Sequence, residues 1–145
     1  MPAADRHCLM PLPLPHEADL RLVLVILRRM AAHGLQDSRA VMLALHGWRT
    51  PFRQPLTLLR AYLVEVARAS HRRIRFAPCC AQRMTLDEGR LIGVLAAARS
   101  NPTCAVRHLA LLCESEEVSA PLSVARLFGE ALEDLGRPLR LSSAE

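Results

Sequence analysis

The sequence predicts an all-α protein, a compact bundle of about six helices with a proline-rich N-terminal arm. The length of 145 residues suits one domain. Hydrophobic residues make up 51% of the chain and aromatic residues only 3%, and abundant leucine and alanine favour helices over sheets of β-branched and aromatic side chains. We expect a single helical domain over residues 16–138, with an extended arm (1–15) before it and a C-terminal tail (139–145) after it.

The arm and the first helix are marked by prolines and then by an apolar repeat. The arm contains Pro2, Pro11, Pro13 and Pro15. Proline at this density favours extended backbone, which predicts an arm lying across the body. From Glu17 to about His33, apolar residues recur at the i, i+3, i+4, i+7 spacing of a helix, and Gly34 supplies the stop. The apolar surface from Leu20 to Met30 is wider than one stripe, so this helix is either central to the core or shared with a second subunit.

The next two helices begin at recognisable signals. Asp37 can cap a second helix that runs through His46 and ends at Gly47. A third begins at Thr50-Pro51 or at Gln54-Pro55, because proline is tolerated in the first turn. Its apolar face is formed by Leu56, Leu59, Leu63 and Val66. Residues 71–78 read as a frayed helix end or a short extended segment, and the loop of Cys79 and Cys80 follows.

Three further helices complete the predicted bundle. Thr85 and Glu88 match the capping box, in which two side chains reciprocally bind free backbone amides, and the fourth helix runs from about Leu86 to Arg99. Asn101-Pro102 is a cap followed by proline at the first helical position, which opens the fifth. Ser119 begins the sixth, whose apolar face includes Phe128 and which stops before Gly136 and Pro138.

The composition of charged residues excludes several enzyme classes. All 19 basic residues are arginine, so the chain has no Schiff-base lysine, pyridoxal phosphate anchor or P-loop lysine. A glycine-rich phosphate loop, a G-x-S-x-G elbow and an H-E-x-x-H motif are also missing from the sequence. The adjacent acids Asp87 and Glu88 are explained by the start of a helix. We therefore predict no catalytic residues and no enzyme activity.

A basic face is predicted between Arg49 and Arg75. This stretch has seven arginines against the single acid Glu65, whereas residues 114–145 have seven acids against three arginines. Such a face can meet phosphate, nucleic acid or an acidic partner segment, including the acidic end of another copy. The candidate anion-binding residues are Arg60, Arg68, Arg72, Arg73 and Arg75. Nucleic acid is not favoured, because zinc-finger, helix-turn-helix and aromatic RNA-binding patterns are missing from the sequence.

The adjacent cysteines Cys79 and Cys80 are a candidate site for metal binding or redox chemistry. Nearby arginines favour the thiolate, which is the reactive and metal-binding form. A disulfide between neighbouring residues requires strained geometry, so pairing with a third thiol is more plausible. Cys104 and His108 are four residues apart on one helix face and could complete a zinc site with the pair, although the chain has no C-x-x-C signature. The alternative is that small sulfur side chains fill a turn and no metal or other cofactor binds.

The likeness to a known family depends on short stretches of sequence. They are residues 28–32, 55–56, 59–61, 77–80, 83–85 and 87–88. Through these stretches the chain resembles an uncharacterised family of small helical alphaproteobacterial proteins, chiefly of the sphingomonad type. The resemblance implies a bacterial, cytoplasmic protein and supplies no activity, ligand or catalytic residue.

The remaining sequence features bear on location and partners. No segment reaches the roughly 18 uncharged apolar residues of a membrane-spanning helix, and the N-terminus has no secretion signal pattern. Five cysteines, an odd number, fit reduced thiols in the cytoplasm. The function expected first is a non-enzymatic interaction or regulatory module that self-associates, as a homodimer for example, or binds another protein. The alternatives are a thiol-based metal or redox sensor at Cys79 and Cys80, and phosphate or nucleic-acid binding by the basic face.

Overall fold

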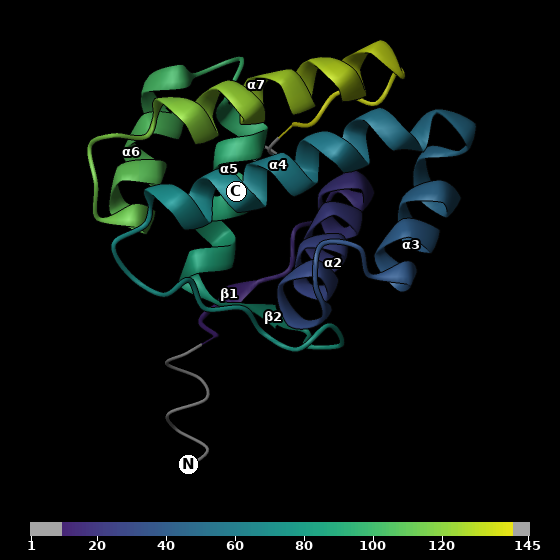
Figure 1. The fold of residues 1–145 in the computed structure, drawn as a ribbon, viewed down its shortest axis with the longest axis horizontal. Coiled ribbons are helices and arrows are strands. Elements are labelled where there is room, and N and C mark those ends of the chain that lie inside the picture. The colour runs from purple at the N-terminus through teal and green to yellow at the C-terminus, as the bar shows by residue number, and fades with distance from the viewer. Residues whose placement is uncertain (1–9, 141–145) are drawn as a thin grey trace.

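The computed structural model describes residues 10–140. Within that range it contains six α-helices, one short 3₁₀ helix and a two-stranded sheet (Figure 1). The helices are α2 (Ala18–His33), α3 (Ser38–Trp48), η1 (Thr50–Phe52), α4 (Arg53–Ala69), α5 (Leu86–Ala97), α6 (Pro102–Cys113) and α7 (Ser119–Asp134). The strands are β1 (Leu12–Pro13) and β2 (Arg83–Met84). The predicted all-α class and number of helices are confirmed for this part of the chain.

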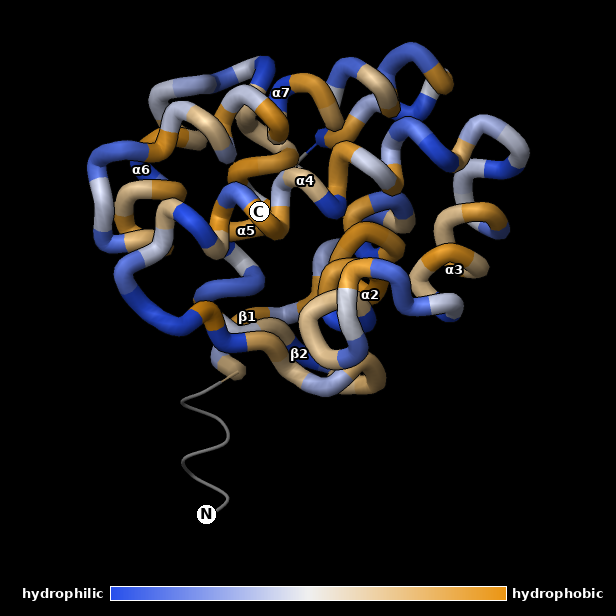
Figure 2. The backbone as a smooth tube through the Cα atoms, in the orientation of Figure 1, coloured by the Kyte–Doolittle hydropathy of each residue, from blue (hydrophilic) through white to orange (hydrophobic). Residues whose placement is uncertain are grey.

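The helices pack around one hydrophobic core. α4 and α7 lie side by side, α5 packs against α6, and α2 packs against α3 (Figure 1). In Figure 2 the hydrophobic residues gather where α2, α4 and α5 meet, and hydrophilic residues lie in the loops and along the helices. Leu20, Val23, Ile26 and Leu27 of α2 are fully buried. The wide apolar surface of this helix is therefore buried inside the chain itself, the first of its two predicted environments.

The predicted helix starts are confirmed in their hydrogen bonds. Asp37 and Asn101 each accept a hydrogen bond from a backbone amide in the first turn of their helices, at 3.0 and 3.2 Å. Thr85 and Glu88 form both halves of the capping box. These side chains satisfy amides that have no partner within the helix, so the local sequence sets where the three helices begin.

The predicted end of the second helix is wrong. α3 continues through Gly47 to Trp48, and the turn follows at Arg49, whose φ of 63° is left-handed. Leu22 of α2 occupies the space that a Cβ at position 47 would need. The glycine therefore permits a close approach of two helices and does not end one. Trp48 then reaches the core, where its ring meets the edge of Phe128 with centroids 6.0 Å apart.

The third predicted helix begins in two steps. The Thr50-Pro51 signal starts η1, and Gln54-Pro55 lies in the first turn of α4. α4 ends at Ala69, and residues 70–85 then run to α5, with helix absent from this segment and β2 near its end. We call residues 70–85 the α4–α5 connection. It is the segment around which the candidate site is built.

Both ends of the described chain contact its body. β1 pairs antiparallel with β2, with Leu12 opposite Met84, which confirms extended backbone for this part of the arm. Residues 1–9 of the predicted arm and 141–145 of the predicted tail lie outside the described range. Arg140 donates its backbone amide to Glu17 at 3.2 Å, so the beginning of the tail rests on the start of α2. Over residues 10–140, the search for a helix with the length and hydropathy of a membrane span finds none.

Candidate functional site

The buried carboxylate of Glu88 fixes the middle of the α4–α5 connection. Its Oε2 accepts hydrogen bonds from Arg28 Nε at 2.7 Å and from the Ala77 amide at 3.1 Å. Its Oε1 accepts from Arg28 Nη2 at 3.0 Å and from the Thr85 amide at 2.9 Å. A charge buried this deeply requires full pairing to be tolerated. Glu88 therefore acts both as a helix cap and as the anchor of a distant part of the connection.

Arg28 completes this buried network from the opposite side. Its Nη1 donates to the carbonyl of Ala81 at 2.9 Å and its Nη2 to the carbonyl of Arg83 at 2.9 Å. Only 2% of Arg28 is exposed. The second half of the connection, residues 77–85, thus wraps around one guanidinium of α2.

Asp87 fixes the first half of the connection. Its carboxylate accepts from Arg72 Nη1 at 2.9 Å, from Arg72 Nη2 at 3.1 Å and from the Arg75 amide at 2.7 Å. Arg72 also donates to the carbonyl of Leu112 in α6 at 3.0 Å. The hydrogen bond to Asp87 raises the pKa of Arg72 above its usual value. Arg72 is therefore a structural residue that ties the connection to α5 and α6.

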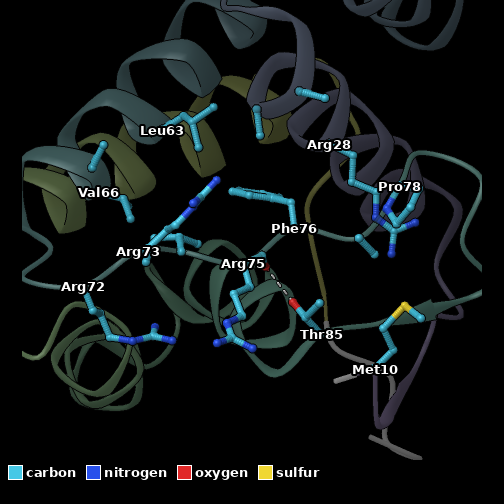
Figure 3. Close-up of a pocket in the computed structure, with 15 residues that line it drawn as sticks. Met10, Arg28, Leu63, Val66, Arg72, Arg73, Arg75, Phe76, Pro78 and Thr85 are labelled. Atoms are coloured by element: carbon cyan, nitrogen blue, oxygen red, sulfur yellow. Dashed lines mark hydrogen bonds between the residues drawn. The ribbon is translucent and has the colours of Figure 1, made fainter. Parts of the chain in front are cut away.

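An open groove lies between α2, α4 and the connection (Figure 3). Its volume is about 1030 Å³. Its apolar lining includes Leu63 and Val66 of α4 and Ile74 and Phe76 of the connection. Figure 3 shows the side chains of Arg73 and Phe76 directed toward each other within the groove. The site thus combines an apolar wall with a cationic group.

A smaller hollow lies next to the groove. Its volume is about 340 Å³, and its lining includes Arg75, Arg90 and the apolar side chain of Leu111. Arg75 lines both the groove and this hollow. Its guanidinium points away from Phe76 in Figure 3, so it forms the border between the two.

The five arginines of the predicted anion-binding face differ in their contacts. Arg60 donates to the carbonyl of Leu35 at 2.8 Å, and Arg68 pairs with Glu65 on the surface of α4 at 3.3 Å. Arg72 is held by the carboxylate of Asp87. Within residues 10–140, only Arg73 and Arg75 of this set have side chains with neither a hydrogen bond nor an ion pair, and both are exposed. The predicted face is therefore not one continuous free surface.

The predicted thiols Cys79 and Cys80 lie in an exposed turn. A hydrogen bond from the Ala81 amide to the Pro78 carbonyl, 3.0 Å long, closes this turn. The pKa of Arg29 is raised first by its hydrogen bond to a carboxylate and, to a lesser extent, by the Cys79 thiol.

The carboxylate that holds Arg29 belongs to Asp37. Arg29 Nη2 and Nε each lie 3.0 Å from one of its oxygens. The hydrogen bond from Arg29 lowers the pKa of Asp37, and this effect outweighs the opposing effect of burial. The guanidinium of Arg29 is thus held in place by the cap of α3.

The four predicted metal ligands are not gathered into one site. Cys104 and His108 lie half-buried on α6, and the ring of His108 packs beside Gly93 of α5. Among residues 10–140, no group of three or more His, Cys, Asp or Glu side chains is placed to hold one metal ion. The structure therefore does not assemble the four-ligand zinc site predicted from Cys79, Cys80, Cys104 and His108.

Sequence reasoning missed the two adjacent arginines of α2 and the aromatic side chain in the connection. Neither Arg28 nor Arg29 is among the site residues that the sequence predicts. The available signal was that the residues one turn before and one turn after Arg28 are apolar, which is unusual for a solvated arginine; they are Leu24, Val25, Ala31 and Ala32. Phe76 carried no such signal, since its role depends on the path of a segment without regular structure.

Comparison with known proteins gives one match. The model of a family of unknown function, DUF6628, matches residues 1–140. The chain belongs to this family. Membership agrees with the resemblance to an uncharacterised family noted in the sequence. No curated protein and no solved structure matches the chain.

Proposed function

We propose that this protein is a non-enzymatic interaction module whose groove binds a short acidic segment of a partner protein. The observation that supports this proposal is the exposed, unpaired guanidinium of Arg73 beside the apolar wall at Phe76. A segment that places a carboxylate on Arg73 and an apolar side chain on the wall would satisfy both parts of the groove. Arg75 at the border would add a second cation for a neighbouring acid.

The chemistry of the groove favours such a mixed ligand over a simple anion. Arginine binds carboxylates through two parallel hydrogen bonds, which gives the contact a defined direction. Removing the apolar lining from water would stabilise the complex by about 25 cal/mol per Å² of apolar surface buried. An inorganic anion would use the guanidinium and leave the wall exposed.

Protein is favoured over nucleic acid as the partner. Binding to a phosphate backbone depends on several cations that contact successive phosphates. Of the five arginines predicted for this role, Arg60, Arg68 and Arg72 are held by carbonyl or carboxylate groups of the chain itself. Two free guanidiniums beside an apolar wall suit a peptide better than a polynucleotide.

Self-association was predicted from the apolar segment Leu20 to Met30. Most of that segment is buried within the chain, so this support for a dimer is removed. A second copy would have to bind through another surface, and its acidic residues 114–134 are one source of an acidic segment. Light scattering at micromolar concentration would report the oligomeric state.

We infer a cytoplasmic, alphaproteobacterial protein from the sequence resemblance.

The proposal can be tested with a short fluorescein-labelled peptide in which glutamate and leucine alternate. Fluorescence anisotropy should show binding that weakens with salt. The double variant Arg73→Gln, Arg75→Gln should lower the affinity roughly tenfold, which corresponds to about 1.4 kcal/mol. Phe76→Ala should weaken binding without changing its dependence on salt.

The matched control is Arg68→Gln, which removes an exposed arginine of α4 that pairs only with Glu65. It should bind the peptide like the original protein. Peptides with glutamine for glutamate, or serine for leucine, should bind poorly. Equal affinities of the Arg68 and Arg73/Arg75 variants would contradict the proposal. Tight binding of mixed-sequence DNA at low salt, with no peptide binding, would favour the phosphate alternative instead.

A further inference from the structure

The small hollow beside the groove combines exposed apolar side chains with unpaired cations. Leu86 at the start of α5 and Leu111 near the end of α6 both line the hollow, and they are 50% and 55% exposed. Arg75 and Arg90 line it as well, and across residues 10–140 their side chains form neither a hydrogen bond nor an ion pair. Two leucines on neighbouring helices thus leave apolar surface in water that a partner would bury.

An acidic segment lies at the edge of the same hollow. We call residues 114–117, between α6 and α7, the acidic connector. Its first residue, Glu114, lines the hollow. The carbonyl of the preceding residue accepts a hydrogen bond from the His71 amide at 2.9 Å, which holds the connector beside the end of α4 (Figure 1). Glu116 and Glu117 are exposed, and neither forms an ion pair in the described part of the chain.

The charges of this surface match those of a second copy of the same surface. Asp87 and Glu114 of the hollow share the guanidinium of Arg72. Arg75 and Arg90 therefore remain as the unpaired charges of the lining, and the acidic connector beside them supplies unpaired charges of the opposite sign. A nucleic acid or an anionic membrane carries one sign of charge, so the connector would repel it. A second copy, related by a twofold axis, brings each sign to its opposite.

We propose that this chain forms a twofold dimer in which the hollow of each copy receives the acidic connector of the other. Arg75 and Arg90 then face the connector of the second copy, and the exposed leucines of the two copies are removed from water. A twofold contact uses the same surface on both copies, so every favourable pair occurs twice. We expect a dissociation constant on the order of 10 µM, which suits a small interface rich in charge.

Sedimentation velocity of the whole chain over a range of micromolar concentrations tests the proposal. The sedimentation coefficient should rise with concentration from that of a monomer to that of a dimer. Leu111→Ser should raise the dissociation constant about tenfold, because it removes apolar surface from the contact. The matched control is Leu127→Ser, which changes a leucine of α7 that is 51% exposed and does not line the hollow. This control should dimerise like the original protein.

Two charge-reversal variants test the symmetry of the contact. Arg90→Glu places an acid opposite the acidic connector of the second copy, and Glu117→Arg places a cation opposite the cationic lining. Each variant alone should dissociate at concentrations where the original protein is dimeric, because like charges then face each other. An equimolar mixture of the two should associate, since each copy then offers the charge that the other lacks. Circular dichroism should show that both variants stay folded, because neither side chain has an ion pair to lose within residues 10–140.

Several outcomes would overturn the proposal. They are a protein that stays monomeric over the whole concentration range, a dimer that Leu111→Ser leaves intact, and a mixture of the two charge variants that stays monomeric. Binding to phosphatidylglycerol vesicles that is lost in Leu111→Ser and Arg90→Glu, without a dimer in solution, would assign the surface to an anionic membrane instead.

The dimer and the peptide groove can be tested separately. Arg90 and Leu111 do not line the groove, so Arg90→Glu and Leu111→Ser should bind the glutamate–leucine peptide like the original protein. Loss of the dimer with peptide binding intact is therefore the expected result for these variants. A dimer without any peptide binding would contradict only the proposed function.

Discussion

The arginines around the α4–α5 connection fall into two groups that differ in what they bind. Arg28 and Arg72 point inward, and carboxylates and backbone carbonyls of the same chain occupy their guanidiniums. Arg73 and Arg75 come from the same connection, and within residues 10–140 their side chains are without hydrogen bonds or ion pairs. The inward group determines the shape of the connection, and the outward group is available for a ligand.

The difference shows why net charge alone describes this protein poorly. The formal charge of +5 counts all arginines equally. Arg28 is neutralised by Glu88 in the interior, so its charge has little influence on a partner in solution. The effective basic surface is smaller than the sequence implies, and at the groove its unpaired members are Arg73 and Arg75.

The largest effect is expected where an inward arginine loses its carboxylate. Glu88→Gln should destabilise the protein by about 3–5 kcal/mol, because it leaves the buried guanidinium of Arg28 without a counter-charge. Urea denaturation followed by circular dichroism measures this change. The double variant Arg28→Met, Glu88→Leu should remain destabilised, because it also leaves the amides of Ala77 and Thr85 without their acceptor. A loss below about 1 kcal/mol in Glu88→Gln would contradict the assigned role of this ion pair.

A smaller loss of stability is expected when Arg72, the second inward arginine, loses its carboxylate partner. Asp87→Asn should cost about 1.5–3 kcal/mol, the usual range for hydrogen bonds to charged groups. The loss should be smaller than for Glu88 because Arg72 is partly exposed and can be solvated when its partner is neutral. Denaturation under the same conditions gives the ranking of the two variants. The reverse ranking would mean that the first half of the connection contributes more to stability than the second.

Substitution of the outward arginines should have almost no effect on the stability of the protein. Arg73→Gln and Arg75→Gln are expected to change the free energy of unfolding by less than about 0.5 kcal/mol, because no side-chain hydrogen bond or ion pair within the described chain is lost. The same variants should weaken peptide binding. The comparison between the two groups would fail if either variant destabilised the protein as much as Asp87→Asn.

The smallest expected effect is on the pKa of His108, whose imidazole lies near the positive charges of two arginines. The pKa of His108 lies below its ordinary value of 6.5, first because of burial and then because of the positive charges of Arg90 and Arg107. NMR titration of the imidazole should show this low pKa. Arg90→Gln should raise it part of the way, while Arg126→Gln, a change on α7, should leave it unchanged.

The sign of the related pH dependence follows from the lowered pKa. The unfolded chain binds a proton at His108 more readily than the folded chain, so stability is complete above about pH 6.5 and declines as the pH falls below that value toward the folded pKa. The variant His108→Gln should lose this part of the dependence. A steeper decline in the variant would contradict the assignment.

Local sequence was sufficient for most of the fold. The caps at Asp37, Thr85 and Asn101 could be predicted because each depends on residues within one helical turn. The end of α3 could not be predicted in this way, because Gly47 allows the close approach of Leu22, a residue of another helix. Short-range patterns thus located helices better than they located helix ends that depend on packing.

The candidate site was only partly predictable for the same reason. The arginine-rich stretch was visible in the sequence, and Arg73 and Arg75 were among the residues chosen. Which arginines are free depends on carboxylates and carbonyls far away in the chain, such as Glu88, which lies 60 residues from Arg28. No periodicity or spacing rule contains that pairing.

The wrapping of the connection around Arg28 has a consequence for local opening. The amides of Ala77 and Thr85 donate to a carboxylate that is itself bound to α2, and the connection has no helix of its own between them. We expect these amides to be released to solvent only when α2 and α5 separate. Their hydrogen exchange should therefore require the free energy of global unfolding, although they lie in a loop, and the floor of the groove belongs to the most slowly exchanging part of the molecule.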